Sequence, residues 1–303
     1  MAPTQEGRSL AITLGVSFGI QLVFYIISAP LKTEKLYDIS GSLTYLACVL
    51  IALFVRQEPI SLLSDRQIIA ASFVVVWTLR LGIYLFKRVL REGKDARFDE
   101  LKTQPLRFAV PWFLQAVWVF LTAFPVYILL GIPGVVQPPL GLASDIIGII
   151  VWTVGFLIEV VSDLQKDQFK QKNPKSFMCT GIWKYSRHPN YFGEILLWIG
   201  VFIFCAGGFS EDWQYVSIIS PVFVFCLIVF VSGIPLLEKS AEKRYGQLSE
   251  YQAYKSKTHV LLMLPPSVAV KINKCTQKPV KVAETAPSSS PVLETKDETA
   301  KKK

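Results

Sequence analysis

Charge and histidine are scarce in this chain. Charged residues make up 18% of its 303 residues, and the two histidines are His188 and His259; soluble domains carry about 25% charged residues. The five cysteines form no C-x-x-C pair and show no metal-ligand spacing. We therefore expect no metal site. We interpret the cysteines, three of which lie in apolar runs, as reduced packing residues.

The net charge of +9 does not indicate a nucleic-acid partner. The lysines and arginines lie next to long apolar runs, whereas a nucleic-acid-binding protein carries a basic face on a soluble fold. Beside apolar runs, basic residues set membrane topology and contact lipid head groups. We therefore expect membrane lipids, and no nucleic acid, among the partners of this chain.

The chain contains several long apolar runs. Hydrophobic residues make up 51% of the sequence, and they fall in blocks of about twenty, the length that crosses a bilayer core. This pattern predicts an all-α, polytopic integral membrane protein with about seven transmembrane helices. The expected spans are residues 10–28, 42–55, 68–86, 111–130, 143–161, 194–208 and 214–237. Six spans are the alternative if the short sixth segment is a re-entrant or interfacial helix.

Basic residues in the short loops predict the orientation of the spans. Two predicted loops are rich in lysine and arginine, whereas residues 131–142 and 207–213 contain neither. The basic residues are Lys87, Arg88, Arg91, Lys94, Arg97, Lys102 and Arg107 in the third loop, and Lys166, Lys170, Lys172, Lys175, Lys184 and Arg187 in the fifth. We expect both loops and the C-terminus in the cytosol. In a eukaryote, the expected membrane is that of the endoplasmic reticulum.

The composition divides the chain into two parts. Residues 1–266 contain the apolar runs and predict one transmembrane domain with a cytosol-facing pocket. Residues 267–303 are rich in Lys, Thr, Pro, Ser and Glu, a composition that cannot bury a core. We expect this second part to be a disordered, charged cytosolic tail.

Three polar segments border the membrane on the predicted cytosolic side. Polar groups at membrane depth are energetically costly, so a cluster of them indicates a functional site. The first segment contains Glu159, Asp163, Lys166 and Lys170, at spacings of three and four residues that share one helix face. The second contains Arg187, His188, Asn190, Tyr191 and Glu194, and the third contains Glu238, Glu242, Arg244, Tyr251, Tyr254 and Lys257.

Together the segments predict a pocket for a nucleotide-like cofactor. Basic side chains would bind phosphates, carboxylates would accept from ribose or carboxamide groups, and tyrosines such as Tyr254 would flank a base. Each segment also has a simpler interpretation. These are solvated ion pairs for the first, a helix-capping histidine for the second, and a surface helix on lipid head groups for the third.

One run resembles the C-terminal signature of the steroid 5α-reductase and sterol reductase superfamily: C-T-G-I-W-K-Y-S-R-H-P-N-Y-F-G-E-I-L-L-W-I-G, residues 179–200. The match is closer to its poorly characterised branch, whose members are named only as domains of unknown function. That branch also carries W-x-x-R-L-G-x-Y-L-x-x-R, D-x-R-F and W-x-x-Q-x-x-W-V, here residues 77–88, 95–98 and 112–119. The resemblance covers residues 68–265 and is weaker over residues 1–66.

The resemblance implies a membrane reductase that takes NADPH from the cytosol and a lipid or steroid-like substrate from the membrane. In the steroid-reducing members, hydride goes to the β-carbon of an enone while a tyrosine, supported by a glutamate, polarises the carbonyl. Alignment of R-L-G-I-Y with the tyrosine segment assigns this role to Tyr84, because a phenol stays protonated at neutral pH. Glu58 is the candidate glutamate, although the predicted topology puts its loop away from the cofactor. An interfacial aromatic is the alternative role for Tyr84.

For the cofactor, the resemblance carries over to Asp163, Lys170, Asn190, Glu194, Arg244 and Lys257. The R-H-P-N-Y match adds Arg187, His188 and Tyr191, while Lys166 follows from helical position. Where the steroid enzymes have an asparagine one turn before the aspartate, this chain has Glu159. Its charge would repel a pyrophosphate unless it pairs with Lys166.

Two other functions are alternatives. Membrane methyltransferases of the isoprenylcysteine and phospholipid type use S-adenosylmethionine and share R-H-P-x-Y-x-G, so Arg187 and His188 do not discriminate. Asn190 and the upstream R-L-G-x-Y-L and D-x-R-F segments favour the reductase. A non-catalytic family member is the third interpretation, which the retained polar groups disfavour because unused polarity in a membrane lowers stability.

Overall fold

The computed structural model describes residues 5–55, 59, 62–92, 95 and 98–276. Seven helical segments in these ranges are long and apolar enough to cross a membrane, and the named secondary-structure elements there are all helices. The chain is therefore an all-α, polytopic membrane protein, and the prediction of seven spans is confirmed.

The first six spans are single helices. They are α1 (Gln5–Ser28), α2 (Tyr37–Val55), α3 (Asp65–Glu92), α4 (Pro105–Thr122), α6 (Ala143–Lys172) and α7 (Pro189–Ala206). The seventh combines a 3-10 helix (Asp212–Ile218), α8 (Ile219–Cys226), a π-helical turn (Leu227–Val231) and α9 (Ile234–Tyr245). The shorter helices are α5 (Phe124–Gly131), α10 (Ser249–Lys257) and α11 (Pro266–Thr276).

Prolines set helix boundaries that differ from the sequence prediction. The fourth span begins at Pro105. Proline is favoured at the first position of a helix, because the backbone N–H that it lacks would have no hydrogen-bond partner within the helix. It ends at Thr122, and Pro125 occupies the first turn of the separate helix α5. The sixth span begins at Pro189 rather than at residue 194, so most of the R-H-P-N-Y cluster lies in its first turn.

Helix α11 occupies the start of the segment that composition predicts to be a disordered tail. Val268, Ala269 and Ile272 recur at helical spacing there, and α11 packs against α10. Ala269 is fully buried, so an apolar face orders this stretch despite its polar composition. Residues 277–303 lie outside the described part of the chain.

Helix α1 buries its polar side and exposes its apolar side. Its buried residues are Ser9, Thr13, Ser17, Gln21 and Ser28. Ser17 Oγ donates to the carbonyl of Ala116 at 2.9 Å, and Gln21 Nε2 donates to Thr44 Oγ1 at 2.8 Å. Leu22, on the outer side, is 56% exposed. This arrangement suits lipid, where interhelical hydrogen bonds and packing hold helices together without a hydrophobic driving force.

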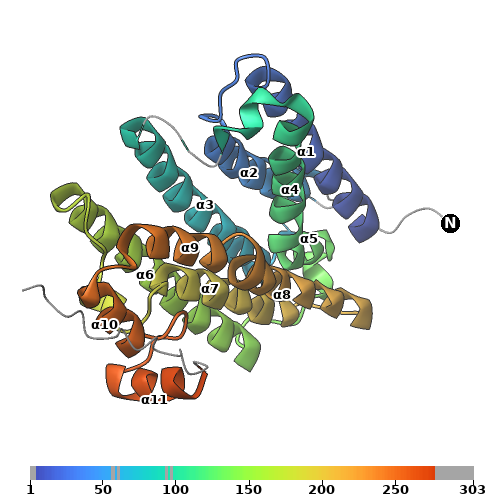
Figure 1. The fold of residues 1–303 in the computed structure, drawn as a ribbon. Helices are drawn as coiled ribbons and strands as arrows, with labels where there is room; N and C mark the ends of the chain where they lie inside the picture. Colours follow the sequence, from blue (N-terminus) through green and yellow to red (C-terminus); the bar gives the residue numbers. More distant parts are fainter. Residues whose placement is uncertain (1–4, 56–58, 60–61, 93–94, 96–97, 277–303) are drawn as a thin grey trace, which may run out of the picture.

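Helices α6 and α7 approach closely through glycines at seven-residue intervals. These are Gly148 and Gly155 on α6, and Gly193 and Gly200 on α7. A Cβ on Gly155 would lie 2.5 Å from the backbone nitrogen of Leu197. Small residues permit this backbone contact in membrane helices. Figure 1 shows α6 and α7 in the middle of the fold, with α1, α2 and α4 on one side and α10 and α11 on the other.

Helices α3 and α6 run in parallel and are joined by long side chains every seventh residue. The contacts are Arg66–Asp145, Phe73–Trp152 and Arg80–Glu159. Arg66 donates to both carboxylate oxygens of Asp145, at 2.8 and 2.7 Å, and the stacked rings of the middle pair have centroids 4.4 Å apart. Both ion pairs join residues 79 positions apart in the sequence. The residues of α3 and α6 therefore keep the same alignment from one ion pair to the other.

Replacing Gly155 with alanine should lower the melting temperature. The new methyl group would meet the backbone of α7 near Leu197 and Gly193, and overpacking of this kind costs about 1–3 kcal/mol. Gly19→Ala is the matched control, because nothing lies within 4 Å of a Cβ at Gly19 on α1. Tryptophan fluorescence during heating in detergent measures both variants, and equal melting temperatures would contradict the close approach of α6 and α7.

Candidate functional site

A cluster of charges lies between α3 and α6 at membrane depth. Arg80 Nη1 donates to Glu159 Oε1 at 2.5 Å, and Arg80 Nη2 donates to Asp163. Trp77 Nε1 donates to the other carboxylate oxygen of Glu159 at 3.2 Å. Glu159 and Asp163 are 3% and 5% exposed. Because removing an ion from water is costly, Arg80 is the partner that allows both carboxylates to sit here.

This cluster corrects the sequence interpretation of the α6 segment. Glu159 and Asp163 face α3 and are not solvated ion pairs along their own helix. Lys166 lies with its ammonium 5.1 Å from the centre of the Trp183 ring, and the side chains that donate hydrogen bonds to Glu159 are those of Arg80 and Trp77. Arg80 is the first arginine of the W-x-x-R-L-G-x-Y-L-x-x-R motif, but the sequence alone assigned it no role. The available signal was an arginine within an apolar run, which requires a buried acidic partner.

A cavity of about 920 Å³, here called the central cavity, adjoins the cluster. It brings together seven residues predicted from the sequence: Tyr84, Asp163, Lys166, Asn190, Tyr191, Glu194 and Arg244. Its other lining residues are Asp38, Leu81, Leu85, Arg88, Asp95, Trp118, Glu159, Ser232, Leu236, Leu237 and Ser240. The predicted residues converge from α3, α6, α7 and α9, which the sequence separates by up to 160 positions.

Asn190 and Glu194 lie on the first turns of α7 and line the central cavity. Asn190 Oδ1 is buried and has no hydrogen-bond partner in the described ranges. A buried acceptor without a partner costs about 1–3 kcal/mol. A ligand that donates a hydrogen bond from an N–H or O–H group to Asn190 Oδ1 would remove that cost. Asn190 can therefore bind a polar ligand.

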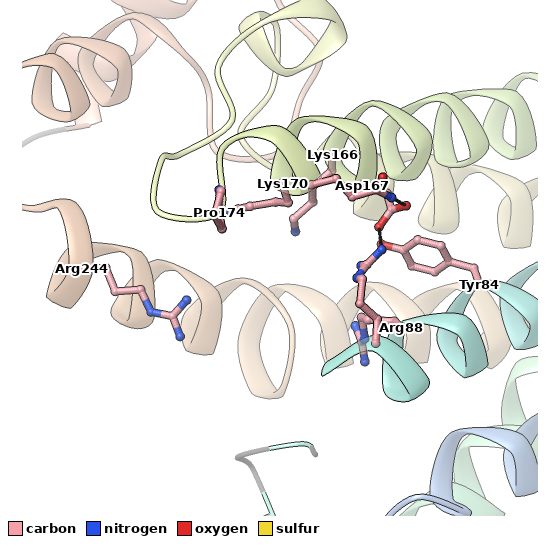
Figure 2. Close-up of a pocket in the computed structure, with 9 residues that line it drawn as sticks. Tyr84, Arg88, Lys166, Asp167, Lys170, Pro174 and Arg244 are labelled. Atoms are coloured by element: carbon pink, nitrogen blue, oxygen red, sulfur yellow. Dashed lines mark hydrogen bonds and ion pairs between the residues drawn. The ribbon is translucent and has the colours of Figure 1, made fainter. Parts of the chain in front are cut away.

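A second cavity of about 520 Å³, here called the outer cavity, shares Tyr84, Arg88, Lys166 and Arg244 with the central cavity. Its remaining lining residues are Arg91, Asp167, Lys170, Gln171 and Pro174. Figure 2 shows Tyr84 and Arg88 on α3 opposite Lys166 and Lys170 on α6, with Arg244 pointing in from α9. Asp167 is the acidic residue in this lining, and it pairs with Arg91 at 2.6 Å. The outer cavity therefore favours an anion.

A third cavity of about 160 Å³, here called the side cavity, is rich in aromatic rings. It is lined by Lys166, Lys170, Phe177, Met178, Trp183, Arg187, His188, Leu237, Glu238, Ser240, Ala241, Arg244, Tyr245, Tyr251 and Tyr254. Phe177 stacks on Tyr254 with ring centroids 5.7 Å apart. The Tyr254 hydroxyl donates to the carbonyl of Trp183 at 2.7 Å, and burial raises the pKa of this phenol. The side cavity thus offers flat apolar surfaces beside cations.

The three cavities meet at two cations. Lys166 on α6 and Arg244 on α9 line all three, and Lys170 lines the outer and side cavities. A ligand that extends from the side cavity to the central cavity would pass these groups. The site therefore combines an aromatic end, a cationic middle and a polar inner end.

Arg187 and His188 connect the start of α7 to α9 through Glu238. His188 Nε2 lies 2.8 Å from Glu238 Oε1, and Arg187 Nη1 lies 2.9 Å from Glu238 Oε2. His188 occupies the N-cap position without a capping side-chain bond, and its ring stacks on Tyr191. Burial lowers the pKa of His188, although its hydrogen bond to the Glu238 carboxylate acts in the opposite direction. Arg187 Nε is buried without a hydrogen-bond partner among the described residues, so it can still bind a ligand in the side cavity.

Two predicted residues are not part of this arrangement. Lys257 is exposed at the end of α10 and lines none of the three cavities. Glu58 lies outside the described residues. The carboxylates that line the central cavity with Tyr84 are those of Asp38, Asp95, Glu159, Asp163 and Glu194. In the described ranges, no three His, Cys, Asp or Glu side chains are grouped to hold a metal ion.

A family model described as protein of unknown function DUF1295 matches residues 24–258. The chain belongs to this family. An uncharacterized protein of Schizosaccharomyces pombe is 24% identical over 218 residues, which is 62% of each chain. The Delta(14)-sterol reductase LBR of Gallus gallus is 28% identical over 170 residues, which is 50% of this chain and 25% of that protein. No solved structure matches the chain significantly.

The comparisons point to a steroid-reductase-like family of membrane proteins. This agrees with the resemblance carried by residues 77–88 and 179–200. The chain spans 62% and 25% of the lengths of these two relatives. The similarity to a sterol reductase indicates a reductase-like role in a membrane.

Replacing Arg80 with methionine should destabilise the protein by about 3–5 kcal/mol, because it leaves Glu159 and Asp163 buried without their partner. A second variant that also carries Glu159→Gln should recover part of this loss, since one unpaired charge is removed. Lys255→Met is the control, because its ion pair with Glu242 is exposed and such pairs contribute little. Thermal unfolding in detergent compares the three. An Arg80→Met variant as stable as the control would contradict the role given to this arginine.

Proposed function

We propose that this protein is a membrane-embedded reductase that uses NADPH to reduce a carbon–carbon double bond in a lipid or sterol-like substrate. The observation that carries the proposal is the meeting of the three cavities at Lys166 and Arg244. A dinucleotide cofactor has the same order of parts: a base, then phosphates, then a reactive ring. The similarity to a sterol reductase supports the reaction class.

The side and outer cavities suit the base and the phosphates of this cofactor. Phe177 and Tyr254 offer ring faces against which a base can stack. Lys166, Lys170 and Arg244 would bind phosphate oxygens through charge-assisted hydrogen bonds. The outer cavity has five basic side chains against one acidic one, which favours NADPH, with its additional phosphate, over NADH.

The central cavity suits the reactive ring and the double bond of the substrate. The Asn190 amide would accept a hydrogen bond from the carboxamide of the ring, which gives its unsatisfied oxygen a partner. NADPH, when bound, would supply the hydride. Reduction of a carbon–carbon double bond also consumes one proton, and Tyr84 is the acid that we propose for it because its phenol lines this cavity.

Tyr84 also has a route by which its proton can be replaced. The residue lines both the central and the outer cavity, so a water in the outer cavity could return the proton that the phenol gives up. The guanidinium of Arg80 lies 5.8 Å from the centre of the Tyr84 ring. This cation would stabilise negative charge that develops on the phenol oxygen during proton transfer. Glu58 stays the predicted supporting glutamate.

The end of the molecule that carries these cations would face the cytosol. Arg88, Lys166 and Arg244 line both the outer and the central cavity, and lysine and arginine concentrate on the cytosolic side of membrane proteins. We therefore propose that NADPH enters from the cytosol and that the C-terminus lies there as well. In a eukaryote the membrane would be that of the endoplasmic reticulum.

NADPH should raise the melting temperature of the purified protein in detergent more than NADH does, and S-adenosylmethionine should not raise it. Binding to the folded state stabilises it by about 2.7 kcal/mol at one hundred times the dissociation constant. S-adenosylmethionine has no phosphate to bind the cations at the junction. Stabilisation by S-adenosylmethionine alone would favour a methyltransferase, and stabilisation by neither would favour a non-catalytic protein.

The same measurement on variants tests where the cofactor binds. Lys166→Ala and Arg244→Ala should each reduce the stabilisation by NADPH, because each removes a cation from all three cavities. Lys257→Ala is the matched control, since this lysine is exposed and lies outside the cavities. If Lys257→Ala reduces the effect as much as the other two, the cofactor binds elsewhere.

Tyr84→Phe should lower the reduction rate by at least about a hundredfold, the contribution typical of a general acid, while NADPH still stabilises the protein. The assay follows NADPH absorbance with a sterol carrying a conjugated double bond as substrate. Tyr185→Phe is a control, because Tyr185 lies outside the three cavities. A Tyr84→Phe variant with the normal rate would remove this residue from the chemistry.

A further inference from the structure

A separate cavity of about 160 Å³ lies between α2, α3 and α4. We call it the aromatic cavity, because Tyr45, Trp77 and Trp118 form much of its wall. The ring centroids of Trp77 and Trp118 each lie close to Tyr45, both at 5.2 Å. These rings are rigid and packed edge to face, so the cavity has a fixed shape suited to a flat apolar group.

The aromatic cavity adjoins the central cavity. The residues that line both are Asp38, Leu81, Leu85 and Trp118, so these four form the boundary between the two spaces. A molecule that occupies the central cavity can therefore extend one end past Leu81 and Trp118.

Two polar groups on the wall, the hydroxyls of Tyr45 and Thr78, are buried without a hydrogen-bond partner among the described residues. The Thr78 hydroxyl is buried, on a residue that is 1% exposed, and makes no hydrogen bond within the described part of the chain. Helical hydroxyls commonly donate to the carbonyl four residues back. Ser72 does so to Ile68 at 2.8 Å, and Thr44 does so to Ser40 at 2.7 Å. The free hydroxyl of Thr78 can both donate to and accept from a ligand oxygen.

The size of the aromatic cavity limits what can enter. An empty apolar cavity of about 150 Å³ in another protein accepts benzene, so this one has room for a single six-membered ring and its substituent. It is too small for a whole sterol nucleus. A longer apolar body attached to that ring would remain in the central cavity, which is several times larger.

We propose that the aromatic cavity binds an oxygen-bearing terminal ring of a lipid, and that the Thr78 hydroxyl hydrogen-bonds to the ring oxygen. The identity of this lipid as the substrate rests on the proposed function, whereas the binding itself does not. Thr78 sets the preference for an oxygenated ring over a plain hydrocarbon. The aromatic rings set the preference for a ring over an open chain.

Binding of defined probes to the full chain in detergent tests this subsite. The probes are a cyclohex-2-enone carrying a ten-carbon chain, the corresponding decylcyclohexane, and a straight-chain enone of equal carbon number. Titration is followed by tryptophan fluorescence, since Trp77 and Trp118 line the cavity. The cyclic enone should bind most tightly to the unaltered protein.

Thr78→Val removes the hydroxyl with little change of shape and should weaken binding of the cyclic enone about five- to tenfold, the effect of one neutral hydrogen bond. Binding of decylcyclohexane should not change. Thr78→Ser keeps the hydroxyl and should retain the affinity for the enone. Thr13→Val is the control, because Thr13 is buried on α1 and bonded to the carbonyl of Ser9.

Unchanged binding of the cyclic enone in Thr78→Val, or an equal loss in Thr13→Val, would overturn the subsite. Stabilisation by NADPH is measured on the same samples and separates the two proposals. If NADPH has no effect but Thr78→Val selectively loses the cyclic enone, the proposed cofactor is wrong and the lipid subsite stands. If NADPH binds but the probes do not distinguish the variants, the subsite is wrong and the cofactor site stands.

Discussion

The arrangement of the site depends on one buried ion-pair cluster. In it, Arg80 provides the charge partner and the hydrogen-bond donors for Glu159 and Asp163, which are removed from water. A single guanidinium reaches two carboxylates one helical turn apart, which fixes the rotation of α6 relative to α3. That rotation turns Asp163 and Lys166 of α6 toward the central cavity. The glycine contact with α7 then sets how close Asn190 and Glu194 come to the same space. The polar lining of the cavity is thus held by helix packing rather than by flexible loops.

The three cavities differ in the chemical character of the residues that line them. Cations line the outer cavity, aromatic rings line the side cavity, and carboxylates line the central cavity, where Arg80 pairs with Glu159. An anion can therefore bind where water still reaches it, which lowers the desolvation penalty. The central cavity adjoins the aromatic cavity at Leu81 and Trp118, so a charged cofactor and an apolar lipid can occupy neighbouring spaces.

Much of the helical layout could be predicted from the sequence, because apolar runs and basic loops are local properties. The predicted end of the second span at residue 55 and the predicted start of the fifth at residue 143 agree with α2 and α6, whereas α2 begins earlier and α6 continues further than predicted. The role of Arg80 was less accessible, because its partner lies 79 positions away and hydropathy does not say which helix faces meet. Lys257 matched a motif, yet α10 leaves it exposed. The predicted fourth span continued to residue 130 because the apolar run does not stop at Thr122. In the structure the helix ends at Thr122, and Pro125 lies in the first turn of the separate helix α5.

The register between α3 and α6 restricts how this protein can vary in length. Arg66 and Arg80 each meet a carboxylate on α6 at the same offset in sequence. A residue inserted between the two arginines would rotate one of them by about 100° relative to the other. Only one of the two ion pairs could then form, unless α6 gained a residue at the matching position. Side chains between the arginines are free to change, but insertions and deletions are confined to the connecting loops.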